Sequence, residues 1–310
     1  MEHLQQCPRI GFITPLRFPG GKRKVFSFFH ELIERNGLLD AHYVEPFAGG
    51  AGLALSLLIS GCVKMIHLND LDVAIYAFWK SVLEEPEELC RRVKEARVDI
   101  ATWKQQREII DHPEQYSEVE VGFATLFLNR TNRSGILRGG VIGGLEQAGV
   151  WKIDARFNKD EIIRRIRLIA AYRDNIRVYN RDAVQFLGEM SRWVSPTEAC
   201  FVYADPPYYA KGHTLYYNHY SSEDHQNLAR AMKELTCPWV VSYDDVEDVY
   251  ALYRGVRYLR YQLHYTAQTR ERRGEVMFFH GIKIPPVNGD GKRWWPMYIS
   301  EPSFLDNACD

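Results

Sequence analysis

Short apolar runs and helix-patterned stretches alternate in the first part of the chain. A short predicted strand at residues 43–47 leads into a glycine-rich turn, which is followed by a helix-patterned stretch at 53–59 and a second predicted strand at 63–68. A strand, a helix and a second strand in this order predict a βαβ unit, whose parallel sheet is buried by helices on both faces. A further helix is predicted at 73–83.

The same alternation returns toward the other end of the chain. A helix is predicted at 222–235, and strands are predicted at 176–179, 201–204, 239–243 and 277–280. These segments continue the α/β pattern, so we expect both ends of the chain to contribute to one sheet.

The stretch between them has a different character. It is charged and helix-patterned up to Asp111, apolar at 121–128 and rich in glycine, arginine and asparagine at 129–149, and a basic helix is predicted at 159–172. From Arg130 through Arg181 there are 12 Lys and Arg against 5 Asp and Glu, an excess of seven positive charges. We therefore expect a catalytic α/β domain made of residues 1–84 and 177–310, interrupted by a mainly helical, basic insert at 85–176.

Composition limits the kind of protein. With 310 residues, 46% of them hydrophobic, the chain can bury a sizeable core. Its net charge is only −1, so any affinity for an acidic partner must come from a local cluster of positive charge. Six cysteines occur without CxxC spacing or a His/Cys cluster, so we expect neither a metal site nor disulfides. The chain shows no signal-peptide layout and no run of 18 apolar residues, so we expect a cytoplasmic protein without a membrane partner.

The tetrapeptide Asp205-Pro206-Pro207-Tyr208 follows the apolar run that ends at Ala204. Proline fixes φ and has no N–H, so the two proline carbonyls point in set directions beside a carboxylate at the end of a strand. Such a turn can accept hydrogen bonds from a planar amino group, and the tyrosine ring can stack on a flat ligand. A Pro-Pro pair alone more often marks a structural turn, so other segments must decide between the two interpretations.

A second candidate site begins at the glycine-rich turn, residues 48–52. Its glycines let the backbone approach a ligand closely, and the following helix points its N-terminus to the same place. Asp70 comes 21 positions after Gly49, at the end of the next strand, where a carboxylate can accept hydrogen bonds from both hydroxyls of a ribose. Dinucleotides and adenosyl ligands both fit this arrangement, and a solvated carboxylate at a strand end is the simpler alternative.

Near the start of the chain, an aromatic ring, two glycines and a cation follow one another at Phe18, Gly20-Gly21 and Lys22. The ring of Phe18 is a flat apolar surface, the two glycines let the backbone approach a ligand closely, and Lys22 can pair with a carboxylate. Taken alone, this segment is better explained as a loop leading into a helix predicted at 25–34.

Together these segments resemble a known family. In chain order they are Pro19-Gly20-Gly21-Lys22, Val44-Glu45-Pro46-Phe47 with Gly49-Gly50-Ala51-Gly52, Leu68-Asn69-Asp70, and Asp205-Pro206-Pro207-Tyr208. This order resembles the Dam-like (D12 class) DNA adenine-N6 methyltransferases, over residues 14 to about 280. Residues 129–135 are similar to the Asn/Arg/Gly segment in the central region of that family. Several members of the family belong to prophages or restriction–modification systems.

The resemblance implies a fold, a cofactor and a set of roles. The fold would be a Rossmann-like S-adenosylmethionine-dependent methyltransferase sheet with a mainly helical target-recognition insert. The residues that would contact S-adenosylmethionine are Phe18, Lys22, Phe47, Gly49, Asp70, Asp182 and Asp205. Lys22 would pair with the methionine carboxylate of the cofactor, Asp70 would hold its ribose, and Asp182 would meet its adenine. A helix N-cap is an equally good explanation of Asp182.

The remaining implied roles concern the target base and the DNA. Asp205 and Pro206 would accept hydrogen bonds from the target amino group, and Tyr208 would stack on a base flipped out of the duplex. The residues that would meet phosphates or base edges are Arg130, Arg133, Arg138, Lys152, Arg156, Arg164 and Arg165. For each of them a solvated surface position is an equally good explanation.

The expected activity is the site-specific transfer of a methyl group from S-adenosylmethionine to N6 of a flipped-out adenine in double-stranded DNA. We expect a monomer or weak dimer that needs no metal. The alternatives are an amino-group methyltransferase acting on cytosine N4, RNA or a protein amide, and a catalytically silent DNA-binding relative. A nicotinamide dehydrogenase is disfavoured, because Asp205-Pro206-Pro207-Tyr208 offers it neither a base nor a hydride geometry.

Overall fold

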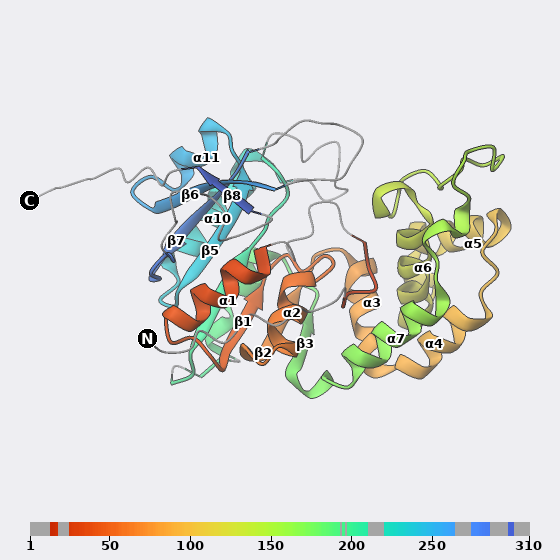
Figure 1. Cartoon of the computed structure of the whole chain (residues 1–310), viewed down its shortest axis with the longest axis horizontal. Helices are drawn as coiled ribbons and strands as arrows, with labels where there is room; N and C mark the ends of the chain where they lie inside the picture. Colours follow the sequence, from red (N-terminus) through yellow and green to blue (C-terminus); the bar gives the residue numbers. More distant parts are fainter. Residues whose placement is uncertain are drawn as a thin grey trace, which may run out of the picture.

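The computed structural model of the chain describes residues 13–17, 25–192, 194–195, 197–209, 220–263, 274–285 and 297–300. It contains an eight-stranded mixed sheet flanked by helices, with the strand order β3-β2-β1-β4-β5-β7-β6-β8 (Figure 1). The strands are β1 (Ala41–Glu45), β2 (Val63–Asn69), β3 (Ile176–Tyr179), β4 (Cys200–Ala204), β5 (Trp239–Asp244), β6 (Arg257–Leu263), β7 (Gly274–His280) and β8 (Met297–Ser300). The α/β class predicted from the sequence is confirmed.

The direction in which strands are added changes within the parallel part of the sheet. β3, β2, β1, β4 and β5 run parallel, while β7, β6 and β8 continue the sheet antiparallel. The chain builds outward from β1 to β2 and β3, then returns to the other side of β1 with β4 and β5. In sheets of this kind, ligands bind outside the carboxyl ends of the strands at the point where the order reverses, which here lies between β1 and β4.

Helices form a layer on each face of the sheet. They are α1 (Phe26–Arg35), α2 (Gly52–Ile59), α3 (Val73–Glu84), α8 (Ala183–Gly188), α10 (Ser222–Glu234) and α11 (Glu247–Leu252). Successive side chains of a strand point to opposite faces. Tyr43 and Tyr203 therefore pack with α1, α2 and α3, whereas Val44 and Val202 pack with α8, α10 and α11. Because all residues of β1 and β4 are buried, these two strands hold the loops that follow them in fixed positions.

A second group of helices lies between α3 and β3 in the chain and to one side of the sheet (Figure 1). Its members are α4 (Pro86–Glu95), α5 (Ile100–Asp111), α6 (Glu118–Thr131) and α7 (Lys159–Ala170). α6 is buried along most of its length and packs against α3 and α5. One hydrophobic core continues from the sheet through α3 into α6 and α7, and the division into two domains stays a prediction.

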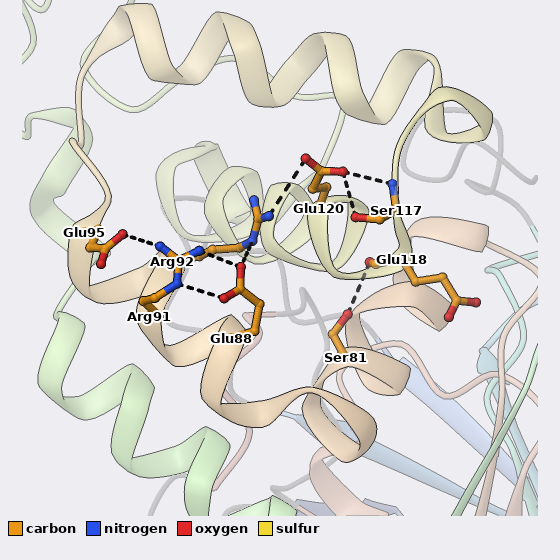
Figure 2. Close-up of polar contacts among 8 residues, drawn as sticks. All are labelled: Ser81, Glu88, Arg91, Arg92, Glu95, Ser117, Glu118 and Glu120. Atoms are coloured by element: carbon orange, nitrogen blue, oxygen red, sulfur yellow. Dashed lines mark hydrogen bonds and ion pairs between the residues drawn. The ribbon is translucent and has the colours of Figure 1, made fainter.

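α6 begins at a capping box. The Ser117 N–H and hydroxyl both donate to the Glu120 carboxylate, at 3.0 and 2.7 Å (Figure 2). Arg92 of α4 bonds to Glu88 at 2.8 Å and lies 3.9 Å from Glu120, which joins the start of α6 to α4. The Ser81 hydroxyl donates to the Glu118 carbonyl at 3.2 Å and so joins the start of α6 to α3. Polar contacts thus fix the N-terminal end of α6.

Two further observations concern the residues that the structure describes. None of the helices there is long and apolar enough to span a membrane, and no group of three or more His, Cys, Asp or Glu side chains is arranged to hold a metal ion. The cysteines in the same part are free thiols: Cys62, Cys90, Cys200 and Cys237.

Candidate active site

Three loops meet outside the carboxyl ends of β1, β2 and β4, which are neighbours in the sheet. The glycine-rich turn follows β1, Asp70 follows β2 and Asp205 follows β4. The parallel register therefore brings together the two candidate sites that were identified separately in the sequence. Their position is the point in the sheet where ligands are expected to bind.

Asn69 joins two loops at this edge of the sheet to the end of β2. Its side-chain N–H₂ donates to the carbonyls of Pro46 at 3.0 Å and Arg181 at 2.9 Å, and its side-chain oxygen accepts from the Arg181 N–H at 3.0 Å. The Ala48 N–H donates to the Asn69 carbonyl at 2.8 Å. Asn69 is fully buried, so its side chain ties the loops after β1 and β3 to the end of β2. The sequence pattern gave no role to this residue.

The Asp70 carboxylate lies against the glycine-rich turn. The Gly49 N–H donates to its Oδ2 at 2.9 Å, and the Asp72 N–H donates to its Oδ1 at 3.0 Å. Gly49 has a φ of 45°, in the left-handed region that glycine adopts without strain. A carboxylate has about four acceptor positions, so these two amides use about half of them. Burial, together with the nearby Asp72 charge, raises the pKa of Asp70 to about 7.

Tyr220 lies near Phe47 and near the carboxylates of Asp70, Asp182 and Asp224. The ring of Phe47 meets that of Tyr220 edge to face, with centroids 5.6 Å apart. Burial raises the pKa of Tyr220, and the charges of nearby Asp182, Asp224 and Asp70 add to this effect. A cavity of about 450 Å³ opens beside this tyrosine, and its lining includes Asp182, Val184, Asp224, Asn227 and Arg230.

Asp182 is also the N-cap of α8. Its Oδ1 accepts from the Val184 N–H at 2.9 Å and from the Gln185 N–H at 3.1 Å. The helix-capping explanation of Asp182 is therefore confirmed, and the same side chain lines the cavity. Taken together, an aromatic face, a strand-end carboxylate and a glycine turn with close backbone approach fit the parts of an adenosyl cofactor.

The loop after β4 is held in place by β5. The Ser242 hydroxyl donates to Asp205 Oδ1 at 2.6 Å, and the Tyr209 N–H donates to Asp244 Oδ1 at 2.8 Å. Pro206 is buried, whereas Asp205 and Tyr208 are partly exposed. Asp205, Pro207 and Tyr208 are therefore partly accessible to a ligand, and most of Pro206 is covered.

Glu45 lies close to Asp205 but inside the protein. It is 5% exposed and accepts a hydrogen bond from the Tyr43 hydroxyl at 2.8 Å. Burial raises the pKa of Glu45 to about 8, and the negative charge of Asp205 adds to this effect. Glu45 is therefore mostly protonated at neutral pH, which avoids a buried negative charge next to the Asp205 carboxylate.

Phe18 and Lys22 lie outside the described residues, but the segment that precedes them is described. The Arg17 N–H donates to Asn129 Oδ1 at 2.7 Å, and Asn129 Nδ2 donates back to the Arg17 carbonyl at 2.8 Å. At Gly135 the φ is +78°, and a Cβ would lie 2.3 Å from the Arg17 carbonyl oxygen. Asn129 and Gly135 thus hold residues 13–17 against the end of α6, which gives a structural reason for the Asn/Arg/Gly segment.

The seven basic residues predicted to bind DNA lie in different environments. Exposed positions are held by Arg133, Arg138, Lys152, Arg156 and Arg164. Arg165 is half-buried, and both it and Arg164 pair with Glu161 at 2.7 Å. Arg130 is only 8% exposed, and burial, with the positive charges of Arg165 and Arg17 nearby, lowers its pKa to about 10.

One surface feature near these residues was not predicted. Val150 and Trp151 are 91% and 67% exposed, in the glycine-rich segment between α6 and α7. The guanidinium of Arg156 lies over the Trp151 ring, 5.9 Å from its centroid. The exposed side of this segment is therefore both cationic and aromatic.

Several solved structures are remotely similar to this chain. One is a protein from Legionella pneumophila, with 11% identity, 85% of this chain and 86% of that chain covered, and a TM-score of 0.33. Another, from Listeria monocytogenes, is described as a class I S-adenosylmethionine-dependent methyltransferase. It has 9% identity, the match covers 91% of this chain and 65% of that chain, and the TM-score is 0.36. The rRNA methyltransferase AviRa from Streptomyces viridochromogenes has 13% identity and a TM-score of 0.31, and the match covers 81% of this chain and 83% of that chain.

A family model gives a more specific match. The model of the D12 class N6 adenine-specific DNA methyltransferases matches residues 18–271, a range that includes the glycine-rich turn, Asp70, the helices α4 to α7 and the tetrapeptide after β4. The resemblance noted in the sequence is thereby confirmed. The chain belongs to the D12 class N6 adenine-specific DNA methyltransferase family.

Proposed function

We propose that this protein transfers a methyl group from S-adenosylmethionine to N6 of an adenine that has been flipped out of double-stranded DNA. The main support is the position of Asp205. Its partly exposed carboxylate stands at the end of β4, beside the β1 and β2 loops that carry Gly49 and Asp70. An acceptor for an amino group and a candidate nucleoside site thus share one edge of the sheet.

The cofactor site would be formed mainly by the loops after β1 and β2. Bound S-adenosylmethionine supplies a methyl group on a positively charged sulfur. Asp70 would accept hydrogen bonds from the ribose hydroxyls, and Phe47 and Gly49 would line the site. Lys22 would pair with the carboxylate of the methionine part, Phe18 would pack close to it, and Asp182 would face the adenine.

The target nitrogen needs help to react, because its lone pair is delocalised into the purine ring. Asp205 and the Pro206 carbonyl would accept hydrogen bonds from its two N–H groups, which favours a pyramidal nitrogen with an available lone pair. The new N–C bond then forms as the S–C bond breaks, and one N–H proton is released. A hydrogen bond to a charged acceptor contributes about 1.5–3 kcal/mol, which corresponds to roughly 10- to 100-fold in rate if it acts in the transition state.

The target base would have to leave the duplex to reach Asp205. Flipping a base costs a few kcal/mol, and stacking on an aromatic ring recovers part of that cost. Tyr208, three positions after Asp205 and partly exposed, is the candidate ring. The exposed basic residues between α6 and α7, and Arg164 and Arg165 on α7, would contact DNA phosphates.

The decisive test combines labelled S-adenosylmethionine, duplex DNA of varied sequence and nucleoside analysis of the product. We expect N6-methyladenine from the unchanged protein, and no product above background from Asp205→Ala, with cofactor binding largely preserved. N4-methylcytosine, or methylation of RNA alone, would replace the proposed target with one of the alternatives. Cofactor binding without any transfer would support a silent DNA-binding relative, and full activity of Asp205→Ala would contradict the mechanism.

A further inference from the structure

β5 holds the loop between residues 205 and 209 at both ends. Ser242 donates to the side chain of Asp205 at 2.6 Å, and Asp244 accepts from the backbone of Tyr209 at 2.8 Å. The two β5 residues are two positions apart, so their side chains lie on the same face of the strand. Neither belongs to a segment that carries the resemblance to the family.

We propose that Ser242 is a positioning residue for methyl transfer, which holds the Asp205 carboxylate in the orientation that accepts the target amino group, and that Tyr203 holds Ser242 in turn. This proposal rests on the proposed function, because it concerns the same carboxylate. It adds two side chains, from β4 and β5, to the reaction.

The number of hydrogens sets the direction of this chain of contacts. A serine hydroxyl has one hydrogen, and an ionised carboxylate only accepts. Since Ser242 donates to Asp205, the Tyr203 hydroxyl, 2.8 Å from Ser242 Oγ, must be the donor to Ser242. The order is therefore Tyr203 to Ser242 to Asp205, and each donor polarises the next one.

The donors are held far more tightly than the carboxylate. Ser242 is 0% exposed and Tyr203 is 2% exposed, whereas Asp205 is partly exposed. The Tyr203 ring meets Phe29 edge to face at 4.7 Å, and Ser242 is paired with Met277 of β7 in the sheet. A partly exposed aspartate otherwise samples several rotamers. A short hydrogen bond from a rigid, buried donor selects one of them.

The selected rotamer matters because catalytic groups must be held within about 0.5 Å of the productive geometry. Loss of one donor that contacts the transition state in an oxyanion hole lowers kcat by about 100- to 1,000-fold. Ser242 acts through Asp205 instead of touching the substrate, so we expect a smaller loss than that.

The test uses two substitutions of equal shape. Ser242→Thr keeps the hydroxyl and Ser242→Val replaces it with a methyl group, so any overpacking from the added atoms is common to both. We expect kcat to fall about 10- to 100-fold in Ser242→Val and to stay within about threefold in Ser242→Thr, with S-adenosylmethionine affinity unchanged in both. Tyr203→Phe, which removes only the second donor, should lower kcat by a smaller factor, about 3- to 10-fold.

Ser81→Ala is the matched control, because Ser81 is also a buried serine (2% exposed) whose hydroxyl is hydrogen-bonded, but it lies on α3 and contacts the start of α6 (Figure 2). Its kcat should match that of the unchanged protein. Equal kcat values for Ser242→Thr and Ser242→Val would overturn the positioning role, whatever their size. That result would leave the proposed function intact, whereas full activity of Asp205→Ala would refute the proposed function itself.

Discussion

At the scale of single residues, Asp70 allows a test of the cofactor site that does not depend on DNA. Its pKa of about 7 means that the carboxylate forms over the neutral range of pH. An ionised acceptor binds ribose hydroxyls more strongly than a protonated one. We therefore expect the dissociation constant for S-adenosylmethionine to fall as pH rises from 6 to 8, as measured by isothermal titration calorimetry.

Asp70→Asn is the companion measurement. The amide cannot accept from both the Gly49 N–H and the Asp72 N–H as the carboxylate does, and it carries no charge. Affinity for S-adenosylmethionine should fall about 10- to 100-fold, and its change between pH 6 and pH 8 should be much smaller than in the unchanged protein. An equally steep pH dependence in Asp70→Asn would assign the titration to another group.

The sequence predicted the charged residues of the site better than the residues that position them. Asp70 and Asp205 each come at the end of a predicted strand, so a strand-end carboxylate could be recognised locally. Asn69 is hydrogen-bonded to Arg181, 112 positions away in the sequence, and Ser242 to Asp205, 37 positions away. Their roles depend on which strands are neighbours, and no local pattern contains that information.

At the scale of elements, the segment between α6 and α7 is where DNA binding is best tested. Arg133 and Lys152 are both exposed and lie at the two ends of its glycine-rich part. Each phosphate contact contributes about 0.9 to the slope of log affinity against log salt concentration. Replacing both by Gln should weaken binding to all duplexes alike and reduce the slope by about 2, measured by fluorescence anisotropy at several salt concentrations.

Arg91→Gln serves as the control for these two substitutions. Arg91 is also exposed, but it lies on α4 and bonds to Glu88 at 2.8 Å and Glu95 at 2.6 Å (Figure 2). We expect its DNA affinity and salt slope to equal those of the unchanged protein. If the Arg133 and Lys152 variant keeps the full slope as well, the DNA surface lies elsewhere on the molecule.

The pattern of polar and apolar residues predicted the elements unevenly. The parallel strands β1, β2 and β4 were predicted to within a few residues, because strands covered on both faces are rich in apolar residues. β6 was not predicted. It carries Arg257 and Arg260 among its apolar residues, and it lies beyond β7 in the antiparallel part of the sheet.

At the scale of the whole molecule, buried ionisable groups make stability depend on pH. Glu45 and Asp70 have pKa values raised to about 8 and about 7, so the folded state binds more protons than the unfolded state between about pH 4 and pH 8. Their contribution to stability is therefore lost as pH rises through that range. Burial, with nearby His42, lowers the pKa of His67 to about 3, which acts in the opposite direction below about pH 6.5.

Above about pH 6.5 the histidine contribution changes little compared with that of the two carboxyl groups. We expect the melting temperature of the ligand-free protein to fall by a few degrees between pH 6.5 and pH 8.5, measured by calorimetry in buffers of matched ionic strength. In Glu45→Gln the amide oxygen can still accept from the Tyr43 hydroxyl and never ionises, so most of this decrease should disappear. Glu84→Gln, at a side chain that is 64% exposed, should keep the full decrease. A melting temperature that is constant or rises over this range, or an unchanged decrease in Glu45→Gln, would show that Glu45 is ionised in the folded protein at neutral pH.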